Sequence, residues 1–182
     1  MKFKTVFESG CMLVLGGAKS GKSRFALDLC NGLQKKRIFL GTAQALDPEM
    51  KERIKRHQEE RGGEWITVEE PMNIVHQIRS FDSEDTVILL DCLTLWLNNL
   101  YMQYDENQES IGQAIEDLLR QLSIMRGAIV VVSNEVGMGI VPDNRLSRRY
   151  RDDAGSANQR IAHLARKVVT VMAGIPLVLK DE

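Results

Sequence analysis

Apolar runs recur along the chain, and most of them are continuous rather than alternating, with polar residues or glycine at their ends. Such runs are typical of strands that are buried on both faces of a parallel sheet covered by helices. Between them lie segments whose apolar residues recur at helical spacing, most clearly 111–122 and 146–164. This alternation predicts an α/β domain. The predicted strands are 12–15, 37–40, 86–90, 128–132, 168–172 and 177–179.

The last two predicted strands are separated only by residues 173–176. A crossover helix does not fit into so short a connection, so we expect these strands to pair antiparallel in an otherwise mostly parallel sheet flanked by helices. No segment between the predicted elements has the composition of an interdomain linker. The pattern therefore predicts a single domain over residues 1–182.

A glycine-rich segment follows the first predicted strand directly and matches the pattern G-x-x-x-x-G-K-[ST]. A strand that enters such a turn, followed by a helix, points backbone N–H groups and a helix N-terminus at one spot where a polyphosphate can bind. We expect Lys22 to reach the β- and γ-phosphates and Ser23 to hold Mg²⁺. The alternative is a turn that binds nothing. The predicted nucleotide-binding residues here are Gly16, Gly17, Ala18, Lys19, Ser20, Gly21, Lys22 and Ser23.

The residues just after the other predicted strands are further candidates, because ligands of such sheets gather at the carboxyl ends of the strands. Asp91 ends a run of four apolar residues, the position of the Mg²⁺-binding carboxylate in many phosphate-loop proteins. It could instead cap a helix that begins near Leu93. Glu135 could polarise a water or orient a substrate hydroxyl, or be a plain loop carboxylate. The second predicted strand is followed by Gly41, Thr42 and Ala43.

The segment 47–63 carries clear helix signals, with Asp47 as N-cap, proline at the first helical position and glycine past the end. Its narrow apolar stripe of Met50 and Ile54 continues to His57, and the other sides are charged. His57 is therefore either a half-buried side chain that completes the stripe or an accessible imidazole that acts as nucleophile or base beside a triphosphate. The spacing alone does not distinguish between these two roles of His57.

Composition narrows the class of partner. The formal net charge is −1, so no strong field attracts nucleic acid or an anionic membrane, and small molecules are the expected partners. Three cysteines without paired spacing argue against a disulfide framework and a structural zinc site, which favours a reducing compartment. Neither a signal peptide nor a long apolar span is present in this sequence. We expect a soluble, cytoplasmic protein with no membrane insertion.

Taken together, three regions closely resemble the family of bifunctional adenosylcobinamide kinases / adenosylcobinamide-phosphate guanylyltransferases of cobalamin biosynthesis. They are the glycine-rich loop, the 47–65 segment with His57, and the 134–142 loop with the residues that follow it. The 134–142 loop is the most specific, since a loop of that composition has no generic structural reason to exist. The match runs from about residue 12 to 180, so residues 1–10 look like an N-terminal extension. Small departures are Lys19, where the family often has arginine, and Asp91, where some members have glutamate.

The resemblance implies two reactions that share a site. In the first, the γ-phosphoryl group of ATP or GTP passes to a hydroxyl of adenosylcobinamide with the help of Mg²⁺ and Lys22. In the second, His57 attacks the α-phosphate of GTP, releases pyrophosphate and carries a guanylyl group. Adenosylcobinamide phosphate then takes the GMP and becomes adenosyl-GDP-cobinamide. The resemblance also implies a RecA-like P-loop NTPase fold and a homotrimer with sites near subunit boundaries.

By the same matching, residues from four separate parts of the chain are implied to line the guanine nucleotide site. An alternative is a P-loop kinase for another small metabolite, in which His57 is only structural. A non-catalytic nucleotide switch is a second alternative, although the base-reading motif N-K-x-D of regulatory GTPases is missing from the sequence. The implied lining residues are Gly41, Thr42, Ala43, Gln58, Glu59, Glu60, Arg61, Glu69 and Asp91.

Overall fold

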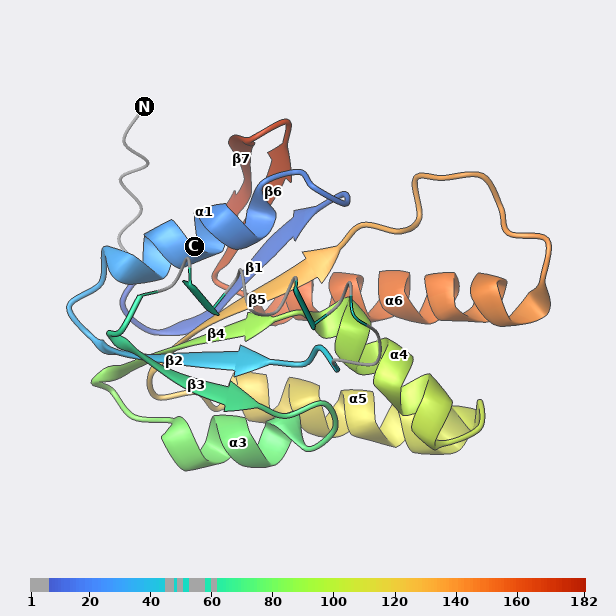
Figure 1. The fold of residues 1–182 in the computed structure, drawn as a ribbon, viewed down its shortest axis with the longest axis horizontal. Coiled ribbons are helices and arrows are strands. Elements are labelled where there is room, and N and C mark those ends of the chain that lie inside the picture. The colour runs from blue at the N-terminus through green and yellow to red at the C-terminus, as the bar shows by residue number, and fades with distance from the viewer. Residues whose placement is uncertain (1–6, 45–47, 49–50, 53–57, 60–61) are drawn as a thin grey trace.

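The strands in the computed structural model, which describes residues 7–44, 48, 51–52, 58–59 and 62–182, form one sheet with helices on both faces (Figure 1). The strand order is β3-β2-β4-β5-β1-β6-β7. Every neighbouring pair is parallel except β6 and β7. The strands are β1 (Gly10–Gly16), β2 (Lys36–Gly41), β3 (Trp65–Glu69), β4 (Thr86–Asp91), β5 (Ala128–Asn134), β6 (Lys167–Met172) and β7 (Ile175–Asp181).

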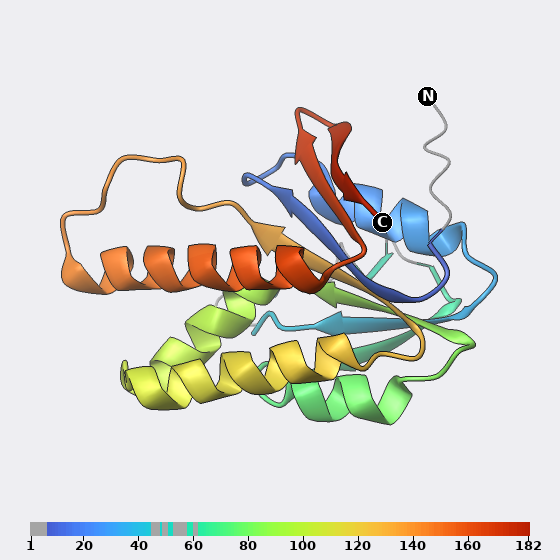
Figure 2. The ribbon, with the colours of Figure 1, turned by 180° about the vertical axis from the view of Figure 1, so that it is seen from behind.

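Two hydrophobic clusters cover the two faces of the sheet. Along β1, Leu13 belongs to the cluster under α3, α4, α5 and α6, whereas Met12 and Val14 belong to the cluster under α1. Figures 1 and 2 show α1 on one side and α3, α4, α5 and α6 on the opposite side. This explains the continuous apolar runs, because both sets of alternating side chains are buried. The helices are α1 (Lys22–Asn31), α3 (Ile74–Phe81), α4 (Leu93–Gln103), α5 (Gln108–Ser123) and α6 (Arg145–Leu164).

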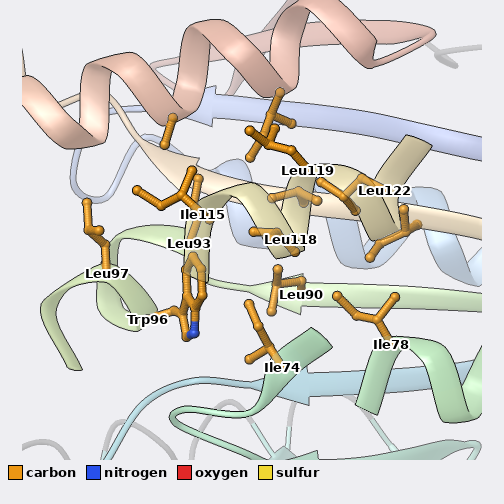
Figure 3. Close-up of a cluster of buried hydrophobic side chains, with 14 of the residues drawn as sticks. Ile74, Ile78, Leu90, Leu93, Trp96, Leu97, Ile115, Leu118, Leu119 and Leu122 are labelled. Atoms are coloured by element: carbon orange, nitrogen blue, oxygen red, sulfur yellow. The ribbon is translucent and has the colours of Figure 1, made fainter. Parts of the chain in front are cut away.

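The larger cluster is built from side chains that α3, α4 and α5 direct towards β4 (Figure 3). Trp96 lies at its edge, almost fully buried, and its indole N–H donates to the carbonyl oxygen of Met72 at 2.9 Å. The indole therefore adds apolar area without leaving a buried donor unsatisfied. Through this packing α4 is held against β5, α5 and α6.

The six predicted strands and the α/β class are confirmed, and β7 extends beyond the predicted 177–179 at both ends. The antiparallel pairing of the last two strands is also confirmed. One strand was missed, β3, which pairs only with β2 at the edge of the sheet. Only Trp65 of its residues is buried, so it lacks the continuous apolar run by which the other strands were found.

The predicted helices at 111–122 and 146–164 are confirmed as α5 and α6. The helix predicted at 47–63 falls largely outside the described residues, and His57 is among those left out. The residues of this segment that the structure places in a helix are Pro48, Lys51, Glu52, Gln58 and Glu59.

All three cysteines are free and buried. Burial raises the pKa of the Cys11 and Cys30 thiols to about 12. Neither thiol is therefore a nucleophile at neutral pH. In the part of the chain that the structure describes, no helix has the length and apolar character needed to cross a bilayer.

Candidate functional site

The glycine-rich loop joins β1 to α1 at the carboxyl edge of the sheet. Gly21 is the N-cap of α1 and has a left-handed φ of 95°, which favours glycine. Lys22, the first residue of α1, is only 8% exposed, and its Nζ donates to the carbonyl oxygen of Gly17 at 3.1 Å. The ammonium group is thus held over the loop, where a polyphosphate would lie.

Ser20 provides a second sign that the loop is built for a ligand. Its Oγ is buried and has no hydrogen-bond partner among the described residues. A buried hydroxyl without a partner costs about 1–3 kcal/mol. A phosphate oxygen bound in the loop would accept that hydrogen bond. The loop therefore fits the phosphate group that its sequence predicts.

Gly16→Ala should distort this loop, because a Cβ at position 16 would lie 2.5 Å from Ser20 Oγ and 2.6 Å from the carbonyl oxygen of Val171. One of these atoms is backbone, so the loop must move, at a cost of about 1–3 kcal/mol. We expect nucleotide affinity, measured with a fluorescent GTP analogue, to fall at least tenfold, with a lower Tm. Gly112→Ala, at a position with no heavy atom within 4 Å, should change neither quantity.

Asp91 ends β4, which is separated from β1 by β5 alone. Burial raises the pKa of the neighbouring Cys92 thiol, the Asp91 charge raises it further, and the Lys22 charge lowers it. Because β4 and β1 are parallel strands of one sheet, Asp91 at the end of β4 and Lys22 after the end of β1 lie at the same edge. The N-cap of α4 is Cys92, so Asp91 does not occupy the capping position that the sequence left open as its alternative role.

Ser23 and Asp91, the two predicted metal ligands, offer a hydroxyl and a carboxylate oxygen, the donor type that Mg²⁺ prefers. Both residues are partly exposed. No group of three or more histidine, cysteine, aspartate or glutamate residues that could hold a metal occurs within the described ranges. This set fits an ion that takes its remaining ligands from phosphates and water, as Mg²⁺ commonly does with nucleotides.

Thr42, a predicted nucleotide-site residue, joins the ends of two strands. Its side chain is fully buried, and its Oγ1 donates to the carbonyl oxygen of Cys92 at 2.8 Å and accepts from the Cys92 N–H at 2.9 Å. Its own N–H donates to Asp91, and its carbonyl oxygen accepts from the side chain of Asn99. All of its polar groups are used within the protein, so Thr42 ties the end of β2 to the end of β4.

Thr42→Val should destabilise the protein by about 1–3 kcal/mol, because the isosteric side chain leaves the Cys92 N–H and carbonyl oxygen without partners. Urea unfolding followed by circular dichroism measures the change. Thr67→Val, the same substitution at an exposed position on β3, should leave the unfolding free energy within about 0.5 kcal/mol of the unsubstituted protein. Equal stability of the two variants would contradict the role assigned to Thr42.

Strands β2 and β3 end at the same carboxyl edge of the sheet as β4. Gly41 is buried at the end of β2 and pairs in register with both Glu69 and Asp91, and Ala43 follows half-buried. Glu69 is exposed at the end of β3, and its Oε1 accepts from Gln58 Nε2 at 2.7 Å. Glu59 is also exposed. Of the predicted site residues, His57, Glu60 and Arg61 lie outside the described part of the chain.

The loop after β5 lies next to the phosphate loop. Asn134 is the last residue of β5, so the loop predicted at 134–142 starts one residue later. The Glu135 N–H donates to the carbonyl oxygen of Gly16 at 3.1 Å, and Glu135 Oε1 accepts from the Gly137 N–H at 2.7 Å. Further along, Ile140 is 97% exposed.

The sequence assigned no role to Asn99 or Asn158, whose buried amides fasten elements of this edge. Asn99 Nδ2 donates to the carbonyl oxygens of Thr42 and Pro71, at 2.8 and 3.0 Å. Asn158 Nδ2 donates to the carbonyl oxygen of Asn134 at 3.2 Å. The signal in the sequence was an amide at a core-facing helical position, which requires a buried partner.

Residues 12–179 match the family model described as cobinamide kinase / cobinamide phosphate guanyltransferase. The chain is 44% identical over 170 residues to the bifunctional adenosylcobalamin biosynthesis protein CobP of Pseudomonas aeruginosa, covering 93% of this chain and 97% of that protein. It is 37% identical over 180 residues to the bifunctional adenosylcobalamin biosynthesis protein CobU of Escherichia coli, covering 93% and 99%. Among solved structures, the RadB recombinase matches with a TM-score of 0.55 at 14% identity, covering 90% of this chain and 75% of RadB. That likeness places the fold among the RecA-like P-loop proteins.

Proposed function

Because the chain belongs to the cobinamide kinase / cobinamide phosphate guanyltransferase family, we propose that it performs both reactions at the single edge described above. It phosphorylates adenosylcobinamide with ATP or GTP and then transfers GMP from GTP to adenosylcobinamide phosphate. The observation that carries this proposal is the convergence of Lys22, Asp91 and the ends of β2 and β3 on one edge of the sheet. The whole chain acts as one catalytic domain, with residues 1–10 as an extension.

In the kinase step, the loop 16–23 holds the triphosphate through its backbone N–H groups, and the Ser20 hydroxyl gains its missing partner. Lys22 neutralises the charge that develops between the β- and γ-phosphates as the bond between them breaks. Ser23 and Asp91 would hold Mg²⁺, which draws charge from the phosphate oxygens when bound. The hydroxyl of the acceptor attacks the γ-phosphorus in line with the leaving nucleoside diphosphate.

In the guanylyl step, His57 supplies the nucleophile. Neutral imidazole attacks the α-phosphorus of GTP, pyrophosphate leaves, and a phosphoramidate bond holds GMP on the ring. The phosphate of the corrinoid then attacks the same phosphorus and frees the imidazole. The neighbouring Gln58 supports this assignment, because its hydrogen bond to Glu69 holds it at the end of β3.

Glu69 is the residue that we assign to guanine. Guanine presents adjacent N1–H and N2–H donors, and a carboxylate accepts from both in a bidentate arrangement. Glu69 is exposed at the strand end, with one described hydrogen bond from Gln58 to its Oε1. The remaining contacts to the nucleotide come from Gly41, Ala43, Glu59, Glu60 and Arg61, while Thr42 positions this edge through Cys92.

We further propose that the protein is a cytoplasmic homotrimer. Support for assembly comes from the β6–β7 edge, where apolar side chains are exposed: Ile175 at 63% and Leu179 at 62%. An edge strand of this kind is a site of association unless it is covered. The three free thiols suit a reducing compartment. Sedimentation equilibrium should give three times the chain mass, and Ile175→Lys should lower it; a monomer at micromolar concentration would contradict the trimer.

The experiment that tests the proposed function supplies the purified protein with adenosylcobinamide, Mg²⁺ and ATP, followed by GTP. Mass spectrometry should detect the corrinoid phosphate first and the GDP-corrinoid only after GTP is added. Phosphorylation without the second product would favour a kinase alone. Nucleotide hydrolysis with no modified corrinoid would contradict both activities.

A further inference from the structure

A pocket of about 860 Å³ lies between α6, the β6–β7 pair and the loop after β5. Its lining includes Leu15 of β1, Glu135 and Met138 of the loop, and Leu179 of β7. We propose that this acceptor pocket binds the corrinoid that receives the phosphoryl group. The proposal rests on the proposed function and assigns a place to its acceptor substrate.

The acceptor pocket adjoins the phosphate loop at one end. Glu135 lines the pocket, and its N–H is bonded to the carbonyl oxygen of Gly16, the first residue of the loop. A second hollow, of about 700 Å³, lies between α3, α4 and α5. Its lining includes no residue of β1, β5 or the phosphate loop among the described residues. Of these two hollows, the acceptor pocket is therefore the one that reaches the phosphate loop.

The charges of the acceptor pocket cancel. Arg151 pairs with Asp152 at 3.1 Å, Lys180 donates to the carbonyl oxygen of His163 at 2.9 Å, and Glu135 adds a second carboxylate. A lining without net positive charge offers a polyphosphate little electrostatic attraction. A bulky corrinoid with apolar ring surface and peripheral amides fits it better, since apolar walls with a few polar groups typify sites for organic ligands. The apolar lining residues are Leu15, Met138, Ala162, Val168 and Leu179.

Gly155 gives the clearest sign that the space is kept for a ligand. It lies in the middle of α6 and lines the pocket, and a Cβ added there would meet no heavy atom within 4 Å. Glycine inside a helix costs about 0.5–1 kcal/mol relative to alanine. No atom of the described residues lies so close to Gly155 that glycine is needed there for packing. Because Gly155 lines the pocket, a ligand that approaches the helix backbone closely would use the space that a side chain here would fill.

Asn158 joins α6 to the end of β5 and offers a hydrogen-bond acceptor to the pocket. It is 5% exposed and lines the pocket, and its Nδ2 donates to the carbonyl oxygen of Asn134. Its Oδ1 is buried and has no hydrogen-bond partner among the described residues. An unsatisfied buried acceptor is unfavourable, and an amide N–H of the corrinoid is the complementary donor.

Glu135 acts at the inner end of the pocket. The corrinoid hydroxyl oxygen forms a bond to the γ-phosphorus, and the bond from that phosphorus to the bridging oxygen breaks. The nucleoside diphosphate leaves with the electron pair, and the hydroxyl proton passes to the Glu135 carboxylate. The hydrogen bond from the Gly137 N–H to Oε1 fixes the orientation of this carboxylate.

The test compares Gly155→Leu with Gly112→Leu, the same change in the middle of α5 at a position that also has open space around it. Both variants should fold with a Tm at or above that of the unsubstituted protein, because leucine favours helix. Gly155→Leu should raise the KM for adenosylcobinamide at least tenfold and leave the KM for ATP unchanged. Gly155→Ala should raise the first KM by a smaller factor, and Gly112→Leu should change neither.

A second variant, Glu135→Gln, should lower kcat of the kinase step about a hundredfold or more. It should leave unchanged the amount of GMP that GTP alone deposits on the protein, since that step uses no acceptor. An unaltered KM for adenosylcobinamide in Gly155→Leu would overturn the pocket assignment while the proposed function stands. Lack of any corrinoid phosphorylation by the unsubstituted protein would instead overturn the proposed function and this inference together.

Discussion

Replacing Lys22 by methionine is expected to lower both the kinase and the guanylyl-transfer rates by at least about a hundredfold, because the same ammonium serves the triphosphate in both reactions. Lys22 is 8% exposed, and methionine has a similar length, so the fold should remain. Steady-state assays with each acceptor measure the two rates. The control is Lys36→Met, at an exposed position at the start of β2, which should leave both rates unchanged.

A loss confined to one of the two reactions in Lys22→Met would mean that the triphosphate binds in two different places. The proposed shared site uses a single cradle, formed by the loop that holds Ser20 and Lys22 with Asp91 at the same edge of the sheet. Parallel losses would support the shared site.

His57→Ala should separate the two reactions. We expect guanylyl transfer to fall by more than about a thousandfold, since the covalent nucleophile is removed. Phosphorylation of adenosylcobinamide from ATP should keep at least about half of its rate, because that step passes no group through the imidazole. Assays with adenosylcobinamide and with its phosphate measure the two rates separately.

His76→Ala is the matched control, since His76 is exposed on α3 and belongs to neither reaction. It should retain both activities. Equal loss of both activities in His57→Ala would indicate a structural histidine, as the apolar stripe of Met50 and Ile54 allows.

The parts of the site that could be predicted from sequence are those whose chemistry is local. The phosphate loop needs glycine, lysine and serine within a few residues, and Asp91 directly follows the apolar run of β4. Both features arise from adjacent residues, so the printed sequence carries them without knowledge of tertiary contacts.

The parts that could not be predicted depend on residues distant in sequence. Thr42 follows a strand and is predicted to line the nucleotide site, but the hydrogen bonds of its hydroxyl with Cys92, fifty positions further along, could not be predicted from the sequence. The acceptor pocket arises where α6 meets β7, and only the packed fold brings them together. The edge strand β3 was missed because, apart from Trp65, it has no buried side chains to mark it.

The most direct test of the central claim follows the α-phosphate of GTP. Protein incubated with Mg²⁺ and α-labelled GTP, then denatured, should retain one label per chain, stable to base, released by acid and mapped to the peptide that contains His57. The label should leave as GDP-corrinoid when adenosylcobinamide phosphate is added before denaturation. Absence of bound label from an enzyme that still makes the GDP-corrinoid, or a label on any other residue, would contradict the account.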